Sequence, residues 1–149
     1  MNAQNSIAMI AKQISVFLEN KSGRLTEVTS ILGEANINLT AFSIAENSEF
    51  GILRMIVSEP ERAYDILKNE HFAVKLTDVL CLNCPNTPGA LAKALQLLSD
   101  EGIFFEYMYA FANGETANVI IRPDDIERCL AILQEHKLEL LAASDLYRL

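Results

Sequence analysis

The chain has 149 residues, half of them hydrophobic, with 12 Lys and Arg against 20 Asp and Glu. The formal net charge of −8 argues against partners such as nucleic acid or an anionic membrane, which require a basic face. Three cysteines without secretory spacing suit a reducing cytosol, and no apolar run approaches the roughly 20 residues of a transmembrane helix. We therefore expect a cytoplasmic protein built from one domain or two small ones.

A strand, a loop and a helix follow residues 1–10, which we interpret as an N-terminal tail. Residues 11–19 alternate between two faces as a half-buried strand does, and the loop Asn20-Lys21-Ser22-Gly23-Arg24-Leu25 comes next. Ser22 and Gly23 are typical of a helix start, and an apolar helical stripe continues to Ala35. The remaining predicted elements are strands at 39–44 and 51–57, a helix that begins at Pro60 and a strand at 72–76.

The same order of elements returns later in the chain. Gly23 and Gly89 are 66 positions apart (89 − 23), and the second loop is Asn86-Thr87-Pro88-Gly89-Ala90-Leu91. The Asn113-Gly114 pair is a strong hairpin signal, and beyond it we expect the offset to fall to about 65 through a loop difference of one residue. The predicted elements of this copy are strands at 79–82, 105–111, 116–122 and 138–143, and helices starting near 88 and 125. Residues 144–149 are predicted to add an edge strand.

The order β-α-β-β-α-β is the split βαβ, or ferredoxin-like, motif, in which both helices cover one face of an antiparallel sheet. The sequence therefore predicts an α+β protein with two such units, at 11–76 and 77–149. Each copy has about 70 residues, which is marginal for independent stability, so we expect shared packing surface. A homodimer that covers the remaining sheet edges is also expected.

The loop patterns resemble a known family. The first copy combines a strand, Asn-x-x-Gly-x-Leu, a helix and Asn36-Ile37-Asn38-Leu39, which resembles the ACT domain, and Pro88-Gly89-Ala90-Leu91 is closer still to the Pro-Gly-x-Leu of that family. The resemblance covers residues 11–149 as two tandem copies. It implies a non-catalytic regulatory module that binds a free amino acid at the loop between first strand and first helix, commonly at an interface between two such domains. Signalling would follow from a changed arrangement of domains or subunits.

The residues of both loops are the predicted ligand contacts. An amino-acid carboxylate needs donors such as the unpaired N–H groups of a first helical turn, and an ammonium group needs oxygens. By resemblance to the serine-binding ACT domain of phosphoglycerate dehydrogenase, Asn20 and Asn38 match two ligand-binding asparagines, whereas Phe104 stands at the second position in the other copy. The first loop is therefore favoured. The predicted set is Asn20, Lys21, Ser22, Gly23, Arg24, Leu25, Asn38, Asn86, Thr87, Pro88, Gly89, Ala90 and Leu91.

Other interpretations of the same residues stay open. Gly23 and Gly89 are alternatively simple helix-entry glycines, and Arg24 is either a solvated helix residue or a partner for a ligand carboxylate. The protein is alternatively a regulatory subunit of an amino-acid biosynthetic enzyme, for example of the acetolactate synthase type, that acts on a catalytic partner. A metal carrier using Cys81 and Cys84 is disfavoured, because strand positions three apart face opposite sides. No catalytic signature is present, so we expect no enzyme activity, cofactor or metal.

Overall fold

A computed structural model describes residues 3–19, 21–46 and 49–149. The chain forms two compact units. The first unit comprises Lys12–Thr77 with Tyr147–Leu149, and the second comprises Asp78–Leu146 with the start of the chain up to Ala11. Each terminal segment therefore groups with the copy that is more distant from it in sequence.

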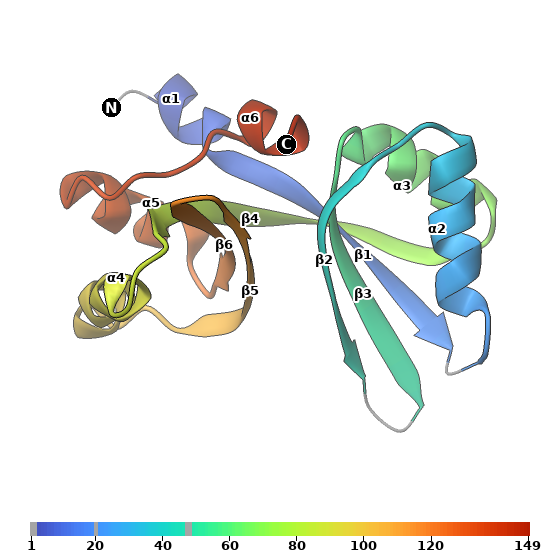
Figure 1. Ribbon diagram of the computed structural model, residues 1–149, viewed down its shortest axis with the longest axis horizontal. Coiled ribbons are helices and arrows are strands. Elements are labelled where there is room, and N and C mark those ends of the chain that lie inside the picture. The colour runs from blue at the N-terminus through green and yellow to red at the C-terminus, as the bar shows by residue number, and fades with distance from the viewer. Residues whose placement is uncertain (1–2, 20, 47–48) are drawn as a thin grey trace. The chain divides into compact units, whose positions relative to one another are not determined.

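The first unit has the ferredoxin-like order that the sequence predicts. Its strands follow the order β2-β3-β1-β4, and β3 is antiparallel to both β1 and β2. Both helices lie on one side of strands β1 to β3 (Figure 1). The elements are β1 (Ile10–Glu19), α2 (Arg24–Glu34), β2 (Leu39–Glu46), β3 (Phe50–Val57), α3 (Pro60–Asn69) and the beginning of β4 (Ala73–Pro85).

Alternation along the strands creates the core of this unit. Ile14 pairs with Met55 and Val16 pairs with Leu53, so these side chains share one face of the sheet. All four are completely buried and belong to one apolar cluster with residues of both helices. Burial of each such side chain stabilises the fold by about 1.5–3 kcal/mol relative to its exposure, which explains why the period-two pattern predicts this face.

The second unit repeats this architecture. Strand β6 is antiparallel to both β4 and β5. Helices α4 and α5 lie on one side of these strands (Figure 1), and their apolar faces join Leu80, Leu82, Val119 and Ile121 in a second core cluster. The elements are α1 (Ala3–Ala8), α4 (Ala90–Asp100), β5 (Phe105–Asn113), β6 (Thr116–Pro123), α5 (Ile126–Glu135) and α6 (Ala143–Tyr147).

Both ends of the chain differ from the sequence prediction. Residues 144–149 were expected to form an edge strand, but Ala143–Tyr147 is helix α6. The N–H group of Leu146 donates to the Ala142 carbonyl, and the Leu146 side chain is completely buried, so apolar burial favours the helical turn. Within the residues predicted as an N-terminal tail, Ala3–Ala8 is helix α1 and Ile10 begins β1.

The strands near residues 72–85 and 138–143 also differ from prediction. The strands expected at 72–76 and 79–82 are parts of one 13-residue strand, β4. The strand expected at 138–143 is reduced to a single antiparallel bridge between Leu82 and Leu140. Two backbone hydrogen bonds accompany this bridge, from Asn83 N–H to the Glu139 carbonyl and from Leu141 N–H to the Cys81 carbonyl, each 2.9 Å.

The internal repeat keeps its offset of 66 throughout, in contrast to the predicted fall to 65. Helices α3 and α5 begin at Pro60 and Ile126 (126 − 60 = 66), and they end at Asn69 and Glu135 (135 − 69 = 66). The turns after them are alike: Phe72 N–H donates to the Leu67 carbonyl, and Leu138 N–H donates to the Leu133 carbonyl. Leu138 is therefore the counterpart of Phe72.

No helix within the described residues combines the length and apolar character needed to span a membrane.

Candidate functional site

A glycine in a left-handed conformation precedes helix α2 of the first unit and helix α4 of the second. Gly23 has φ 89° before α2, and Gly89 has φ 85° before α4. Residues with a Cβ rarely adopt this conformation, which costs them about 1–2 kcal/mol. Because glycine has no side chain, neither cap residue can accept a hydrogen bond from the N–H groups of its helix through a side-chain oxygen. The Arg24 and Ala90 N–H groups donate to the Lys21 and Thr87 carbonyls, and the next two N–H groups of each helix have no acceptor within the helix.

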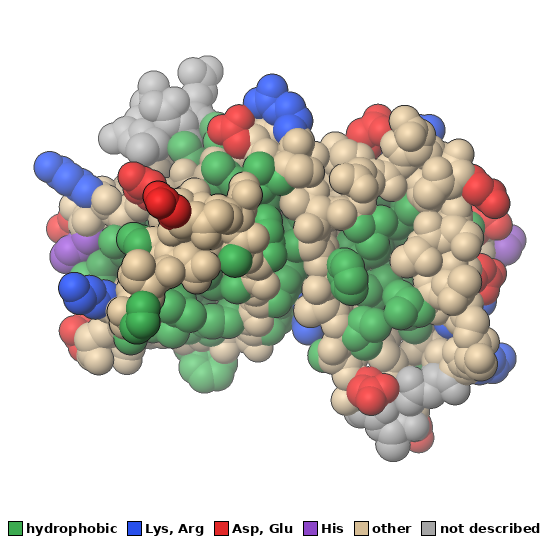
Figure 2. Space-filling view, in the orientation of Figure 1, with side chains coloured by type: hydrophobic (Ala, Val, Ile, Leu, Met, Phe, Trp, Pro, Cys, Tyr) green, Lys and Arg blue, Asp and Glu red, His purple; other side chains and the backbone are tan. Residues whose placement is uncertain are grey.

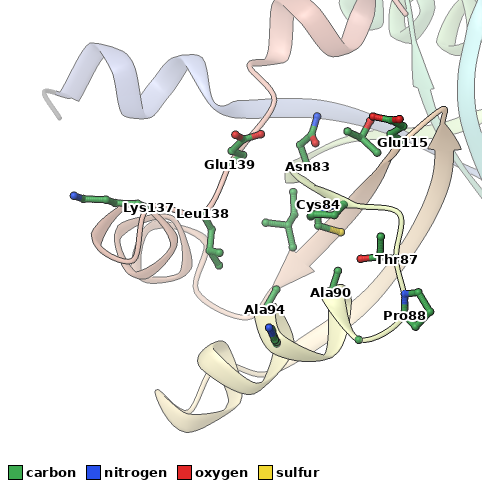
Figure 3. A pocket seen from close by; sticks show the side chains of 15 residues that line it. Asn83, Cys84, Thr87, Pro88, Ala90, Ala94, Glu115, Lys137, Leu138 and Glu139 are labelled. Carbon is green, nitrogen blue, oxygen red and sulfur yellow. The ribbon is translucent and has the colours of Figure 1, made fainter.

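A cavity of about 670 Å³ lies against the second loop (Figure 3). Ala90 and Ala94 on α4 face Cys84 and Leu138 across it (Figure 3). Its volume falls within the range of small-molecule sites, roughly 300–1,000 Å³. The complete lining is Leu82, Asn83, Cys84, Pro85, Thr87, Pro88, Gly89, Ala90, Lys93, Ala94, Glu115, Thr116, Lys137, Leu138 and Glu139.

Four of the six residues predicted for the second loop line this cavity: Thr87, Pro88, Gly89 and Ala90. The other two do not. The Asn86 N–H group donates to the Glu115 carbonyl at 2.8 Å, which ties the loop to the β5–β6 turn. Leu91 packs against the core of the second unit instead.

Charged residues from three different segments surround the mouth of the cavity. Lys93 lies on the first turn of α4, Glu115 lies in the β5–β6 turn, and Lys137 and Glu139 follow α5. All four are exposed, and the Lys137 side chain points away from the cavity (Figure 3). Sequence reasoning missed them, because no local pattern indicates that the segments after β5 and α5 approach the loop. A mouth with both charge signs suits a zwitterionic ligand.

The first loop is arranged differently. Lys21, Ser22, Arg24 and Leu25 line a smaller cavity of about 280 Å³, and the rest of this lining comes from strands β1, β2 and β3. The Lys21 ammonium lies 2.9 Å from the Glu19 carboxylate, and this hydrogen bond lowers the pKa of Glu19. Asn20, the first predicted ligand asparagine, lies outside the described residues.

Arg24 contacts its own unit. Its guanidinium lies 4.7 Å from the centroid of the Phe72 ring, and its Nη1 lies 2.9 Å from Oε2 of Glu27. Within the described part of the chain, its buried Nε has no hydrogen-bond acceptor. Arg24 is therefore a stacked, partly buried residue and not a fully solvated one.

Asn38 is not close to the loop of its own unit. It lies just beyond the C-terminus of α2, whereas the loop precedes the N-terminus, and an 11-residue helix is roughly 16 Å long. The Asn38 N–H group donates to Oγ of Ser58 at 3.0 Å. Phe104 holds the same position in the second unit, where its N–H group donates to Oδ1 of Asp124 at 3.2 Å. The first unit alone therefore does not unite Asn38 with residues 21–25.

The two cysteines of the disfavoured metal-carrier hypothesis lie on opposite faces of β4. Cys84 belongs to the core cluster beneath α4 and α5, whereas Cys81 pairs with Ile120 on the other face. Burial raises the pKa of Cys81 to about 12, which disfavours the thiolate that a metal requires. Among the described residues, no group of three potential metal ligands occurs. The placement of the two thiols on opposite faces of β4 therefore disfavours a metal ion shared between them.

Comparison with known proteins places these features in a family. A family model described as an ACT domain pair matches residues 9–149. A crystal structure of protein BT0572 from Bacteroides thetaiotaomicron is 63% identical, with a TM-score of 0.92, over 95% of this chain and 99% of that one. Comparison with curated proteins gave no match.

Two more distant structures share the fold. The ligand-free regulatory subunit of aspartate kinase from Thermus thermophilus is 16% identical, with a TM-score of 0.60, over 85% of this chain and 95% of that one. The corresponding subunit from Thermus flavus is 18% identical, with a TM-score of 0.58 and the same coverage. With the family model spanning nearly the whole sequence, the chain belongs to the family of ACT domain pairs.

Proposed function

We propose that this protein is a non-catalytic regulatory module that binds a free amino acid. The observation that carries the proposal is the cavity of about 670 Å³ at the Pro88-Gly89 loop, since it joins apolar walls, helix N–H donors and a mouth with both charge signs. The fold shared with regulatory subunits of aspartate kinase supports the regulatory role. The three cysteines are free thiols, which supports a cytosolic location.

Each part of an amino acid has a partner in this arrangement. The carboxylate would accept hydrogen bonds from N–H groups of the first turn of α4, where the helix dipole and the Lys93 ammonium favour negative charge. The ammonium group would lie near the Glu115 carboxylate and the Thr87 hydroxyl. Contacts from the loop residues of the first unit and from Asn38 are implied by the family resemblance alone, and the cavity of the second unit is the site that this proposal favours.

The regulatory signal would arise from linkage. A ligand that binds one arrangement of domains or subunits stabilises it by RT ln(1 + [L]/Kd) relative to the others. We propose a homodimer as the responding assembly. Strand β2 is an edge strand that exposes Phe42 and Ile44, and Figure 2 shows hydrophobic side chains at the surface of both units. Light scattering during size-exclusion chromatography tests this state, and a monomer at all concentrations would contradict it.

A thermal-shift screen tests amino-acid binding directly. The purified chain is heated with each proteinogenic amino acid, and divalent metal ions form the comparison set. We expect one or a few amino acids to raise the Tm, while metals leave it unchanged. If metals alone raised the Tm, or if no amino acid did so, the proposed function would be wrong.

A regulatory subunit for a separate catalytic partner is the second candidate. The shared fold with regulatory subunits of aspartate kinase favours it. The test adds the purified chain to an aspartate kinase, and separately to an acetolactate synthase, from the same organism. A change in the amino-acid sensitivity of either enzyme would support this candidate, and unchanged kinetics in both would leave the free-standing module as the proposal.

A further inference from the structure

Three corresponding positions shape the loop region of both units, and they carry larger side chains in the first unit. The offset of 66 relates Arg24, Val28 and Phe72 of the first unit to Ala90, Ala94 and Leu138 of the second. All three second-unit residues line the cavity of about 670 Å³. In the first unit the equivalent space is bordered by the larger side chains.

The larger side chains close that space. Arg24 lies at the start of α2 and Phe72 follows α3, yet the guanidinium is only 4.7 Å from the ring centroid. Phe72 is 5% exposed, and Val28 on α2 is completely buried in the same apolar cluster as Phe72. In the second unit, the counterparts Ala90 and Leu138 stand on two walls of an open cavity. The smaller cavity of the first unit shares part of this position, since five of its lining residues, Leu18, Glu19, Lys21, Ser22 and Arg24, correspond to lining residues of the large cavity. It extends toward β2 and β3 and does not reach Val28 or Phe72, the counterparts of Ala94 and Leu138.

The first turn of each helix reinforces the difference. Glu27 holds the Arg24 guanidinium through an ion pair of 2.9 Å. The corresponding residues of the second unit are Ala90 and Lys93, which offer no such pair, and Lys93 lines the cavity. The first unit thus places its own cation over Phe72, whereas the second unit presents a lysine at the mouth of an open space.

The walls of the open cavity indicate the chemistry of the ligand side chain. Its buried part consists of Leu82, Cys84 and Ala94, which are 1%, 7% and 4% exposed. The charged residues of the lining are all exposed and belong to the mouth. Transfer of an uncharged apolar side chain from water into this part of the cavity would be favourable, because apolar surface is buried. A charged side chain would lose its hydration there without gaining a buried partner, which is unfavourable.

We infer that the chain binds one amino acid with an uncharged apolar side chain in the cavity of the second unit, and that Arg24 and Phe72 fill the corresponding space of the first. The chemistry of the ligand rests on the proposed function. The open and filled spaces do not, because they follow from side-chain volume and contacts alone.

Thiol labelling tests both spaces without any ligand. Cys84 lines the open cavity and reports on the second unit, and Val28→Cys reports on the filled space of the first. Each protein is treated at neutral pH with methyl methanethiosulfonate, and the modified residue is identified by peptide mass spectrometry. Cys81 and Cys129 are internal references, because burial raises the pKa of both thiols to about 12.

We expect Cys84 to react, because it borders the cavity and keeps 7% of its surface exposed. The cysteine introduced at position 28 should react at least about tenfold more slowly, because this position is completely buried and becomes accessible only through local opening. The triple change Ala90→Arg, Ala94→Val and Leu138→Phe, which copies the first unit, should slow Cys84 by a similar factor. The reverse change, Arg24→Ala with Phe72→Leu, should accelerate labelling at position 28. Equal rates at both positions in the otherwise native chain would overturn the inference, even if the multiple variants failed to fold.

Protection by amino acids tests the ligand class. Leucine, methionine and phenylalanine serve as apolar probes, and aspartate and lysine serve as matched charged probes. At least one apolar probe should slow Cys84 labelling, and neither charged probe should do so. Protection by a charged probe alone would overturn the inferred class. Reactive Cys84 without protection by any amino acid would contradict the proposed function while leaving the assignment of open and filled spaces intact.

Discussion

Arg24 stacks on Phe72 in the first unit, 4.7 Å from guanidinium carbon to ring centroid, where the second unit has an alanine and a leucine facing an open cavity. The two copies therefore have similar backbones but differ in the space that is open to a ligand beside the loop. The difference lies in a few side chains and not in the course of the chain, since both units share the left-handed glycine and the same turn after the second helix.

Truncation of Phe72 and of its counterpart Leu138 should lower the stability of the protein by different amounts. Phe72→Ala removes a buried ring and its cation–π partner, so we expect the free energy of unfolding to fall by about 3–5 kcal/mol. Leu138→Ala removes a half-buried side chain beside an existing cavity and should cost less than about 2 kcal/mol. Urea denaturation of both variants measures the difference. Equal losses would show that Phe72 does not fill the space described for it.

Gly89 should be required for its backbone conformation rather than for space. An added Cβ meets no atom within 4 Å, but φ is 85°, so Gly89→Ala should lower the free energy of unfolding by about 1–2 kcal/mol. Gly33→Ala is the matched control, because Gly33 lies inside α2 with equally open surroundings. That change should stabilise by about 0.5–1 kcal/mol. Chemical denaturation resolves the opposite signs, and two changes of the same sign would contradict the explanation.

Lys93 should contribute to ligand affinity, whereas Lys137 should not. Both residues line the cavity, but the Lys137 side chain points away from it (Figure 3). Loss of a hydrogen bond to a charged group costs about 1.5–3 kcal/mol, so Lys93→Gln should weaken binding of the responding amino acid by roughly 10- to 100-fold. Lys137→Gln should leave the Kd within about twofold. Isothermal titration calorimetry provides both constants, and the reverse ranking would place the ligand carboxylate elsewhere.

The buried cysteines predict a loss of stability at alkaline pH. Desolvation raises the pKa of Cys129 from 9.0 to about 12, with the Asp124 and Asp125 charges adding to the effect. Between these values the unfolded chain has lost the proton and the folded chain keeps it, so the free energy of unfolding falls as pH rises. The slope from one such group approaches about 1.4 kcal/mol per pH unit. Cys129→Ala should reduce the slope between pH 9 and 12 by that amount, and an unchanged slope would contradict the shift.

The sequence predicts most of the backbone and little of the cavity. Alternation in residues 11–19 and the helical stripes specify both ferredoxin-like units, because burial of one face determines each pattern. The last segment differs from its prediction: residues 144–149 are expected to add an edge strand, yet Leu146 is buried as part of helix α6. Local pattern alone does not distinguish a short buried helix from a strand.

The site itself required three-dimensional information. With the expected offset of 65 after the hairpin, Phe72 would correspond to Lys137 in the second copy. The true counterpart is Leu138, so the replacement of a phenylalanine by a leucine at this position is not visible with that offset. The first loop therefore looks the better site, because its asparagines match the family pattern while its Arg24 stacking is invisible in sequence. Cavity volume depends on the sum of side chains from the loop, helix α4 and the turn after α5, and no local motif reports that sum.

Calorimetric titration of the native chain with the amino acid that raises its Tm most tests the account directly. The account predicts one ligand per chain with an apolar side chain, and loss of this binding when Ala90→Arg blocks the second unit. Arg24→Ala should leave the affinity of the second unit unchanged. Binding of two ligands per chain, or binding that survives Ala90→Arg and disappears with Arg24→Ala, would contradict it and return the site to the first loop.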